Sequence, residues 1–122
     1  LDFIIFGQTK SPFCSIGVYN IHNKLKAKRF GTLKLNRDNR VIDFKEKSRK
    51  PDTTFVSPCI YYFTKTRLNL VGQYLREKNN PDMSGHFIDW LYQRDWVYGF
   101  VFHGRWTDIG NLASYKLANK TI

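Results

Sequence analysis

The stretch RFGTLKLNRDNRVIDFKEK, residues 29–47, decides how we expect this chain to fold. Its two arms, 29–34 and 40–47, flank the cluster Asn36-Arg37-Asp38-Asn39. Asn and Asp tolerate left-handed backbone and favour turns, so the sequence predicts a β-hairpin. Glu46 and Lys47 then lie at the far end of that hairpin.

Three further stretches are short and rich in β-forming residues. They are 13–20 (FCSIGVYN), 55–63 (FVSPCIYYF) and 96–102 (WVYGFVF). We expect a strand in each, and Pro58 predicts a bend or bulge in the second because proline cannot donate to the ladder. Backbone irregularity of this kind beside a strand often marks a functional site.

Apolar residues recur at helical spacing in two stretches. Leu68, Val71 and Leu75 form one stripe on an expected helix over 64–78, which we interpret as core packing. A second helix is expected from Ser84, with an apolar face made by Phe87, Ile88, Leu91 and Tyr92. A last helix is expected from Asn111 to Lys120, so helices follow strands and the fold is of the α/β or α+β class.

The length and composition predict one folding unit, residues 1–122. The chain is 42% hydrophobic and 16% aromatic, enough for one modest core. The longest apolar runs fall well short of the roughly 20 residues that span a bilayer, so we expect a soluble protein with no membrane partner. We expect a cytoplasmic location, since no signal-peptide pattern opens the chain, and the missing initiator Met indicates a piece of something longer.

The net charge of +10 suits phosphates, nucleic acid or an acidic partner, and charge alone cannot choose among them. The basic residues gather in two clusters, Lys24-Lys26-Lys28-Arg29 and Lys45-Lys47-Arg49-Lys50. The two cysteines and three histidines are scattered along the chain, which argues against a zinc site or a disulfide framework.

Several motifs, in order, resemble the second half of the catalytic domain of sugar-phosphate nucleotidyltransferases such as glucose-1-phosphate thymidylyltransferases. They are Gly17-Val18-Tyr19, Phe30-Gly31, Asp38-Asn39-Arg40-Val41, Glu46-Lys47, Ile60-Tyr61-Tyr62-Phe63, Asp82-Met83 and Trp106-Thr107-Asp108-Ile109-Gly110. No single motif is specific, but their collinear order is hard to obtain by chance. The family's Gly-rich nucleotide loop occurs nowhere in these 122 residues.

The resemblance implies an α/β fold, namely the carboxyl-terminal portion of a Rossmann-like nucleotidyltransferase domain with a mixed sheet and flanking helices. It also implies a reaction in which a sugar 1-phosphate oxygen attacks the α-phosphorus of a nucleoside triphosphate and expels pyrophosphate, with Mg²⁺ as cofactor. The amino-terminal, nucleotide-binding half of the domain is missing, so we expect this chain to be inactive alone and to associate with that half or to form oligomers.

The resemblance also carries roles to four residues. Lys47 matches the lysine that pairs with the sugar phosphate, and Asp108 matches a carboxylate that binds Mg²⁺; both are expected to be catalytic. Glu46 matches the acid that accepts hydrogen bonds from sugar hydroxyls, and Gly31 a glycine that lets the backbone approach the sugar.

The sequence departs from the family pattern at two places in this region. Ser48 stands where proline usually follows the Glu-Lys pair, and Pro58-Cys59 replaces a small residue and a glycine before Ile-Tyr. Cys59 would either crowd the sugar pocket or fill core space.

Two other classes of function remain open from the sequence. A nucleotidyltransferase-like domain can be a non-catalytic regulatory or oligomerisation module, although such a module would not need Lys47 and Asp108. A small basic nucleic-acid-binding domain would fit the charge, but no RNP-like or helix-turn-helix motif appears, so nucleic acid is not an expected partner.

Overall fold

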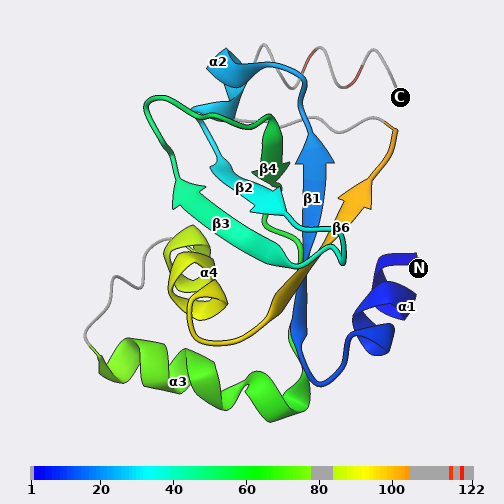
Figure 1. The fold of residues 1–122 in the computed structure, drawn as a ribbon, viewed down its shortest axis with the longest axis vertical. Coiled ribbons are helices and arrows are strands. Elements are labelled where there is room, and N and C mark those ends of the chain that lie inside the picture. The colour runs from blue at the N-terminus through cyan, green and yellow to red at the C-terminus, as the bar shows by residue number, and fades with distance from the viewer. Residues whose placement is uncertain (1, 78–83, 105–115, 117–118, 120–122) are drawn as a thin grey trace.

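The strands come together in one mixed sheet that carries helices on both faces (Figure 1). The computed structural model describes residues 2–77, 84–104, 116 and 119 of the chain. Its strands are β1 (Cys14–Asn20), β2 (Gly31–Leu35), β3 (Val41–Glu46), β4 (Phe55–Ser57), β5 (Tyr61–Tyr62) and β6 (Val97–Phe102). Its helices are α1 (Asp2–Thr9), α2 (Lys24–Ala27), α3 (Asn69–Arg76) and α4 (Ser84–Tyr92), with a 3₁₀ turn at Lys65–Arg67.

The predicted hairpin is confirmed as β2 and β3. The two strands are antiparallel, and Gly31 at the start of β2 lies opposite Glu46 at the end of β3. In the turn, the Asn36 side chain accepts hydrogen bonds from the backbone N–H groups of Asp38 and Arg40, each 2.9 Å long. Asn39 has left-handed backbone with φ of 62°, as expected for a turn residue of this type.

The predicted bend at Pro58 is also confirmed. β4 pairs antiparallel with the end of β1, whereas β5 pairs antiparallel with its beginning. Between them the chain bulges, and Cys59 adopts left-handed backbone with φ of 60°. The other edge of β1 is lined by β6, which runs parallel to it.

The main core lies between one face of this sheet and helices α3 and α4. Its fully buried members include Ile16, Val18, Leu33, Phe44, Ile88 and Leu91. Tyr74, Phe87 and Trp90 add a cluster of edge-on and stacked rings where α3 meets α4. The face predicted for α4 is therefore largely confirmed, because Phe87, Ile88 and Leu91 are buried and Tyr92 is partly buried.

The stripe predicted for the preceding helix is wrong in part. Leu68 and Leu75 are 51% and 49% exposed, while Tyr74 is buried. The α-helix begins only at Asn69, after the 3₁₀ turn, and it presents the large Tyr74 ring to Phe87 and Trp90. An aromatic ring buries more area than a leucine, which is a reason for the helix to turn that face inward.

The opposite face of the sheet is covered by α1, an element that the sequence patterns did not predict. Phe3 packs against Phe100 and Phe102 of β6, with ring centroids 5.9 and 5.6 Å apart. Gly7 lies so close to the Tyr62 ring that an added Cβ would be 2.5 Å from it. Among the described helices, none combines the length and apolar character that crossing a membrane requires.

Candidate functional site

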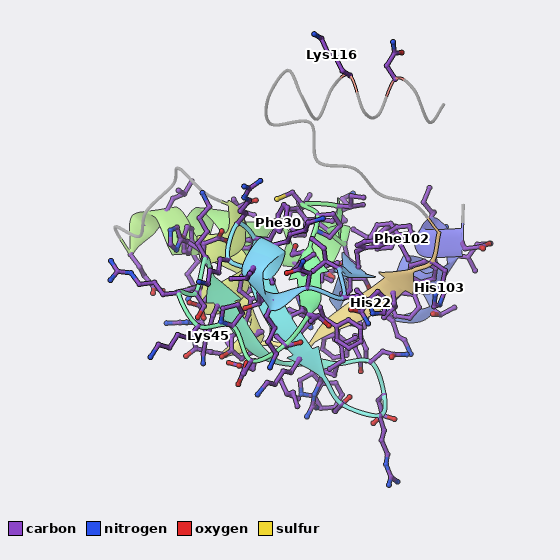
Figure 2. All side chains as sticks on the ribbon, turned by 90° about the horizontal axis from the view of Figure 1, so that it is seen from above. His22, Phe30, Lys45, Phe102, His103 and Lys116 are labelled. Carbon is purple, nitrogen blue, oxygen red and sulfur yellow. The ribbon has the colours of Figure 1, made fainter. Side chains whose placement is uncertain are left out.

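The carboxyl ends of β1, β6 and β3 frame the region where we expect the site. His22 and His103 follow β1 and β6, and Figure 2 views the molecule from above with both residues labelled. The Tyr19 hydroxyl donates to the Gly104 carbonyl across a distance of 3.1 Å, which ties these two ends together. Glu46 ends β3, and Lys47 follows it.

Gly31 and Glu46 are brought together by the hairpin register. They are direct partners, and Gly31 also lies beside Ser57 of β4. A Cβ placed on Gly31 would lie 2.5 Å from Cζ of Phe44 and 3.3 Å from Oε2 of Glu46. The absence of a side chain at position 31 is therefore required by close packing against Phe44, which is itself buried.

The carboxylate of Glu46 also lies against the first turn of α4. A Cβ added to Gly85 would be 1.4 Å from Oε2 of Glu46, so no side chain can stand at position 85 with Glu46 in this rotamer. The Glu46 carboxylate therefore occupies the space beside α4 that a side chain at position 85 would take.

Lys47 begins the loop after β3 with a change of chain direction. Its φ is 49°, in the left-handed region, and its backbone N–H donates to the Phe30 carbonyl at 3.2 Å. Its side chain is exposed and lies next in sequence to Glu46. The structure thus brings Gly31, Glu46 and Lys47 together at one end of the hairpin.

A group of hydroxyls and one thiol lies near these residues. The Tyr61 hydroxyl and the Ser84 hydroxyl are 2.8 Å apart, and Ser84 Oγ donates to Sγ of Cys59 at 3.8 Å. Burial raises the pKa of Tyr61 to about 12, although its hydrogen bond with Ser84 acts in the opposite direction. Tyr61 is therefore a neutral hydroxyl at physiological pH.

Ser57 adds a further polar group. Its residue is 4% exposed, and its hydroxyl interacts with Tyr61, whose pKa it acts to lower. Ser57 also lies beside Gly31 in the sheet.

Four residues of this site were not predicted from the sequence: Ser57, Tyr61, Ser84 and Gly85. The bulge at Pro58 was the signal that could have found Ser57 and Tyr61, because it lies between them. Gly85 carried no such signal, since its role depends on α4 meeting the end of β3.

The predicted metal ligand, Asp108, and its neighbour Trp106 lie outside the described residues. Within the described ranges, His, Cys, Asp and Glu side chains form no group of three or more that could hold a metal ion. The described part of the site is thus a set of hydrogen-bonding groups, one carboxylate and one ammonium, which suits a polyhydroxylated anion.

Comparison with known proteins gives a consistent family. The family model described as "Nucleotidyl transferase" matches residues 8–122. The glucose-1-phosphate adenylyltransferase of Thermosipho africanus (strain TCF52B) is 33% identical over 123 residues, covering 97% of this chain and 29% of the relative. That of Thermotoga sp. (strain RQ2) is 35% identical over 100 residues, covering 77% of this chain and 23% of the relative.

A solved structure has a similar fold. It is a putative glucose-1-phosphate thymidylyltransferase from Bacillus anthracis in complex with a sucrose, with a TM-score of 0.78 and 18% identity. The match covers 98% of this chain and 47% of that one. The fold expected from the sequence, a portion of a nucleotidyltransferase domain with a mixed sheet and flanking helices, is thereby confirmed.

Proposed function

This chain belongs to the nucleotidyl transferase family, and from that premise we propose that it supplies the sugar-phosphate-binding part of a sugar-1-phosphate nucleotidyltransferase. The enzyme would join a sugar 1-phosphate to a nucleoside triphosphate and release pyrophosphate. Because the chain spans 23–29% of the length of two of its relatives, turnover would require further residues, including those that bind the nucleotide.

The observation that supports this proposal best is the position of the Glu46 carboxylate. It lies between Gly31 and Gly85, two positions where a side chain would collide with Glu46 itself or with Phe44. The two glycines allow the Glu46 carboxylate to lie between β2 and the first turn of α4. A carboxylate accepts hydrogen bonds from vicinal sugar hydroxyls in a geometry that depends on their stereochemistry.

The ammonium group of Lys47 would bind the phosphate of the sugar 1-phosphate. In the reaction a phosphate oxygen of the sugar forms a bond to the α-phosphorus, and the bond from that phosphorus to the bridging oxygen breaks, so that pyrophosphate leaves with the electron pair. Negative charge accumulates between the reacting groups, and a nearby cation lowers the cost of bringing them together. The hydroxyls of Ser57, Tyr61 and Ser84 would complete the hydrogen bonds to the sugar.

Asp108 is the one residue of this chain that we propose as a ligand of Mg²⁺. An aspartate oxygen is the kind of ligand that Mg²⁺ prefers, and the ion would neutralise phosphate charge. The family resemblance implies that the companion carboxylate comes from the amino-terminal half of the domain.

Calorimetric titration with glucose 1-phosphate tests the proposal, with Lys47→Ala compared with Lys45→Ala. Both changes remove one exposed lysine from the end of the hairpin, but Lys45 lies within β3 and is not at the proposed site. Loss of one charge-assisted contact should weaken binding roughly tenfold or more in Lys47→Ala. Lys45→Ala should bind as the unchanged chain does.

Glu46→Gln provides an independent arm. The amide keeps the size of the side chain but loses the charge, so we expect weaker binding of the sugar with little change in fold. Equal affinities in Lys47→Ala and Lys45→Ala, together with unchanged binding in Glu46→Gln, would refute the assignment of this site.

A further inference from the structure

The Tyr61 hydroxyl is connected to the proposed sugar-phosphate site through α4. Its oxygen lies 2.8 Å from Oγ of Ser84, the first residue of α4. The next residue, Gly85, has its backbone directly against the Glu46 carboxylate. The phenol is therefore bonded to a residue whose neighbour in the chain touches the carboxylate that we propose to bind sugar hydroxyls.

Tyr61 is also connected to that site through the sheet. Burial raises the pKa of Tyr61, and the Ser57 hydroxyl acts in the opposite direction, as a hydrogen bond donated to the phenol oxygen does. Ser57 pairs with Gly31 across the sheet, and Gly31 pairs in turn with Glu46. The Tyr61 oxygen thus lies between two residues that both adjoin the surroundings of Glu46.

The hydrogen bonds of Ser84 have a direction, and it decides where the Tyr61 proton points. Ser84 Oγ donates to Sγ of Cys59 at 3.8 Å, and a hydroxyl has a single proton to donate. Ser84 must then be the acceptor in its 2.8 Å contact with Tyr61, so the Tyr61 proton is directed at Ser84. What Tyr61 presents to a ligand is a lone pair and not a proton.

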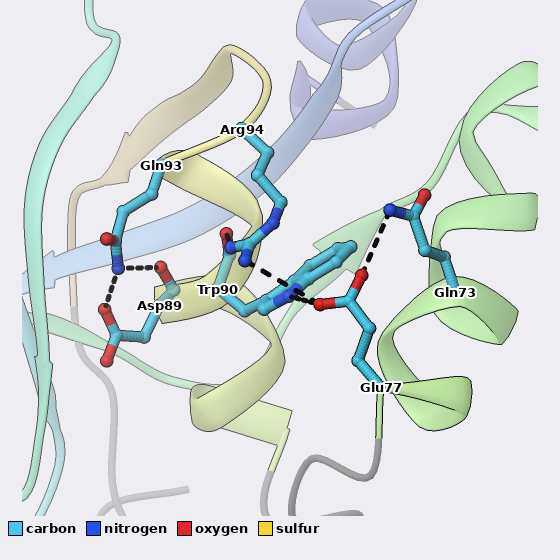
Figure 3. A network of polar contacts seen from close by, with 6 residues as sticks. All are labelled: Gln73, Glu77, Asp89, Trp90, Gln93 and Arg94. Carbon is cyan, nitrogen blue, oxygen red and sulfur yellow. Dashed lines mark hydrogen bonds and ion pairs between the residues drawn. The ribbon is translucent and has the colours of Figure 1, made fainter.

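Ser84 keeps its position because α4 is fixed at its other end. Figure 3 shows that Trp90 Nε1 donates to Oε1 of Glu77 at 3.2 Å, and that Gln73 Nε2 donates to Oε2 of the same carboxylate at 3.1 Å. These bonds tie α4 to α3, and Ile88, one turn after Ser84, is fully buried. A group on an element held in this way can orient a neighbouring side chain at little cost in freedom.

Building on the function proposed above, we infer that Ser84 is a positioning residue that makes Tyr61 a hydrogen-bond acceptor toward the sugar. The ionised carboxylate of Glu46 can also only accept. A site made of acceptors selects sugar phosphates that keep donating groups, hydroxyl or amino, at the ring positions that these two residues contact. It discriminates there against deoxy, fluoro and O-acylated sugars, because their substituents cannot donate a hydrogen bond.

Calorimetric titration with glucose 1-phosphate and two series of analogues tests this inference. Fluorine replaces one hydroxyl at a time in the first series, and hydrogen does so in the second. Tyr61→Phe identifies the ring position that Tyr61 contacts, since only there should the replacements cease to matter. At that position both analogues should bind the unchanged chain roughly fivefold more weakly than glucose 1-phosphate, because neither can donate to the phenol oxygen.

Ser84→Ala should free the Tyr61 proton to turn toward the ligand. The fluorinated analogue should then bind roughly twofold to threefold more tightly than the deoxy analogue, because fluorine accepts a weak hydrogen bond and hydrogen accepts none. Ser84→Thr keeps the hydroxyl and should restore equal binding of the two analogues. A loss of packing alone would lower all affinities by a common factor and leave this ratio unaltered.

Three results would overturn the inference. The fluorinated analogue might already bind the unchanged chain more tightly than the deoxy analogue at that position, Ser84→Ala might leave the ratio as it was, or Tyr61→Phe might relieve the discrimination at no position. Failure of the proposed function gives a different result, in which glucose 1-phosphate does not bind or binds Lys47→Ala as tightly as the unchanged chain. That result would refute both proposals.

Discussion

The two ends of the β3 and α4 pair differ in how closely the strand and the helix approach. At one end, Glu46 touches the first turn of α4 because Gly85 has no side chain there. At the other, a pocket of about 340 Å³ is lined by the residues that begin β3 and by those that end and follow α4. The same strand and helix therefore approach closely where Gly85 meets Glu46, at the closed end, and leave a hollow at their opposite ends, the open end.

Between these two ends, β3 and α4 are joined by a packed core. Phe44 and Ile88, which are 2% and 0% exposed, belong to the core that β3 and α4 share. Burial raises the pKa of Tyr92, which is further raised by the charge of Asp43 on β3. This packed centre sets the distance between β3 and α4, and that distance in turn determines how closely the two elements approach at each end.

The largest loss of stability is expected for Gly31→Ala, at the closed end. Its Cβ would stand 2.5 Å from the buried Phe44 ring, and overpacking of this kind costs about 1–3 kcal/mol of unfolding free energy. At the open end, Ile42→Ala changes a residue that is 50% exposed and should cost less than about 1 kcal/mol. Urea denaturation measures both, and equal costs would contradict the difference between the two ends.

Gly85→Ala should change binding more than stability. The new methyl group would displace the Glu46 carboxylate, a flexible group that can move away, so the affinity for glucose 1-phosphate should fall. Alanine gains about 0.5–1 kcal/mol over glycine in a helix, which offsets part of the collision. Gly72→Ala is the matched control, because its nearest neighbour is the mobile end of Arg76, 3.2 Å away.

Gly72→Ala should stabilise the chain by about 0.5–1 kcal/mol and leave sugar-phosphate binding unchanged. Calorimetry and thermal denaturation of the two variants measure these effects. Unaltered binding in Gly85→Ala would mean that the position of Glu46 does not matter for the ligand.

The smallest effect is expected at Cys59, which has left-handed backbone with φ of 60°. Glycine adopts this conformation without strain, so Cys59→Gly should be about 0.5–1 kcal/mol more stable than Cys59→Ala, which keeps the strain. Both variants lose the contact with Ser84, which makes them a matched pair. A Cys59→Ala protein as stable as Cys59→Gly would show that the bulge relaxes around the residue.

Much of the closed end could be predicted from the sequence. The turn at 36–39 could be predicted, and Pro58 indicated the bulge between Ser57 and Tyr61. Such features depend on neighbours along the chain, so local patterns report them. The pairing of Gly31 with Glu46 also depends on a register shift in the hairpin between Lys34 and Leu35, which no local pattern indicated. The family resemblance then gave Lys47 its expected role, which stays a prediction, as does that of Asp108.

The buried face of α3 could not be predicted in the same way. Leu68, Val71 and Leu75 have helical spacing, yet the Tyr74 ring is the side chain that reaches Phe87 and Trp90. Periodicity finds an apolar stripe but does not say which of two overlapping stripes meets the larger partner. That choice depends on α4, which comes later in the chain.

The sequence by itself determined the strands, the hairpin turn and the glycine and proline positions, because each rests on backbone preferences of a few adjacent residues. Only the tertiary structure decided that Gly85 meets Glu46 and that Arg40 and Arg94 share one pocket. The members of these two pairs lie 39 and 54 positions apart in the sequence, and their placement is set by how α4 packs on β3 rather than by any local pattern.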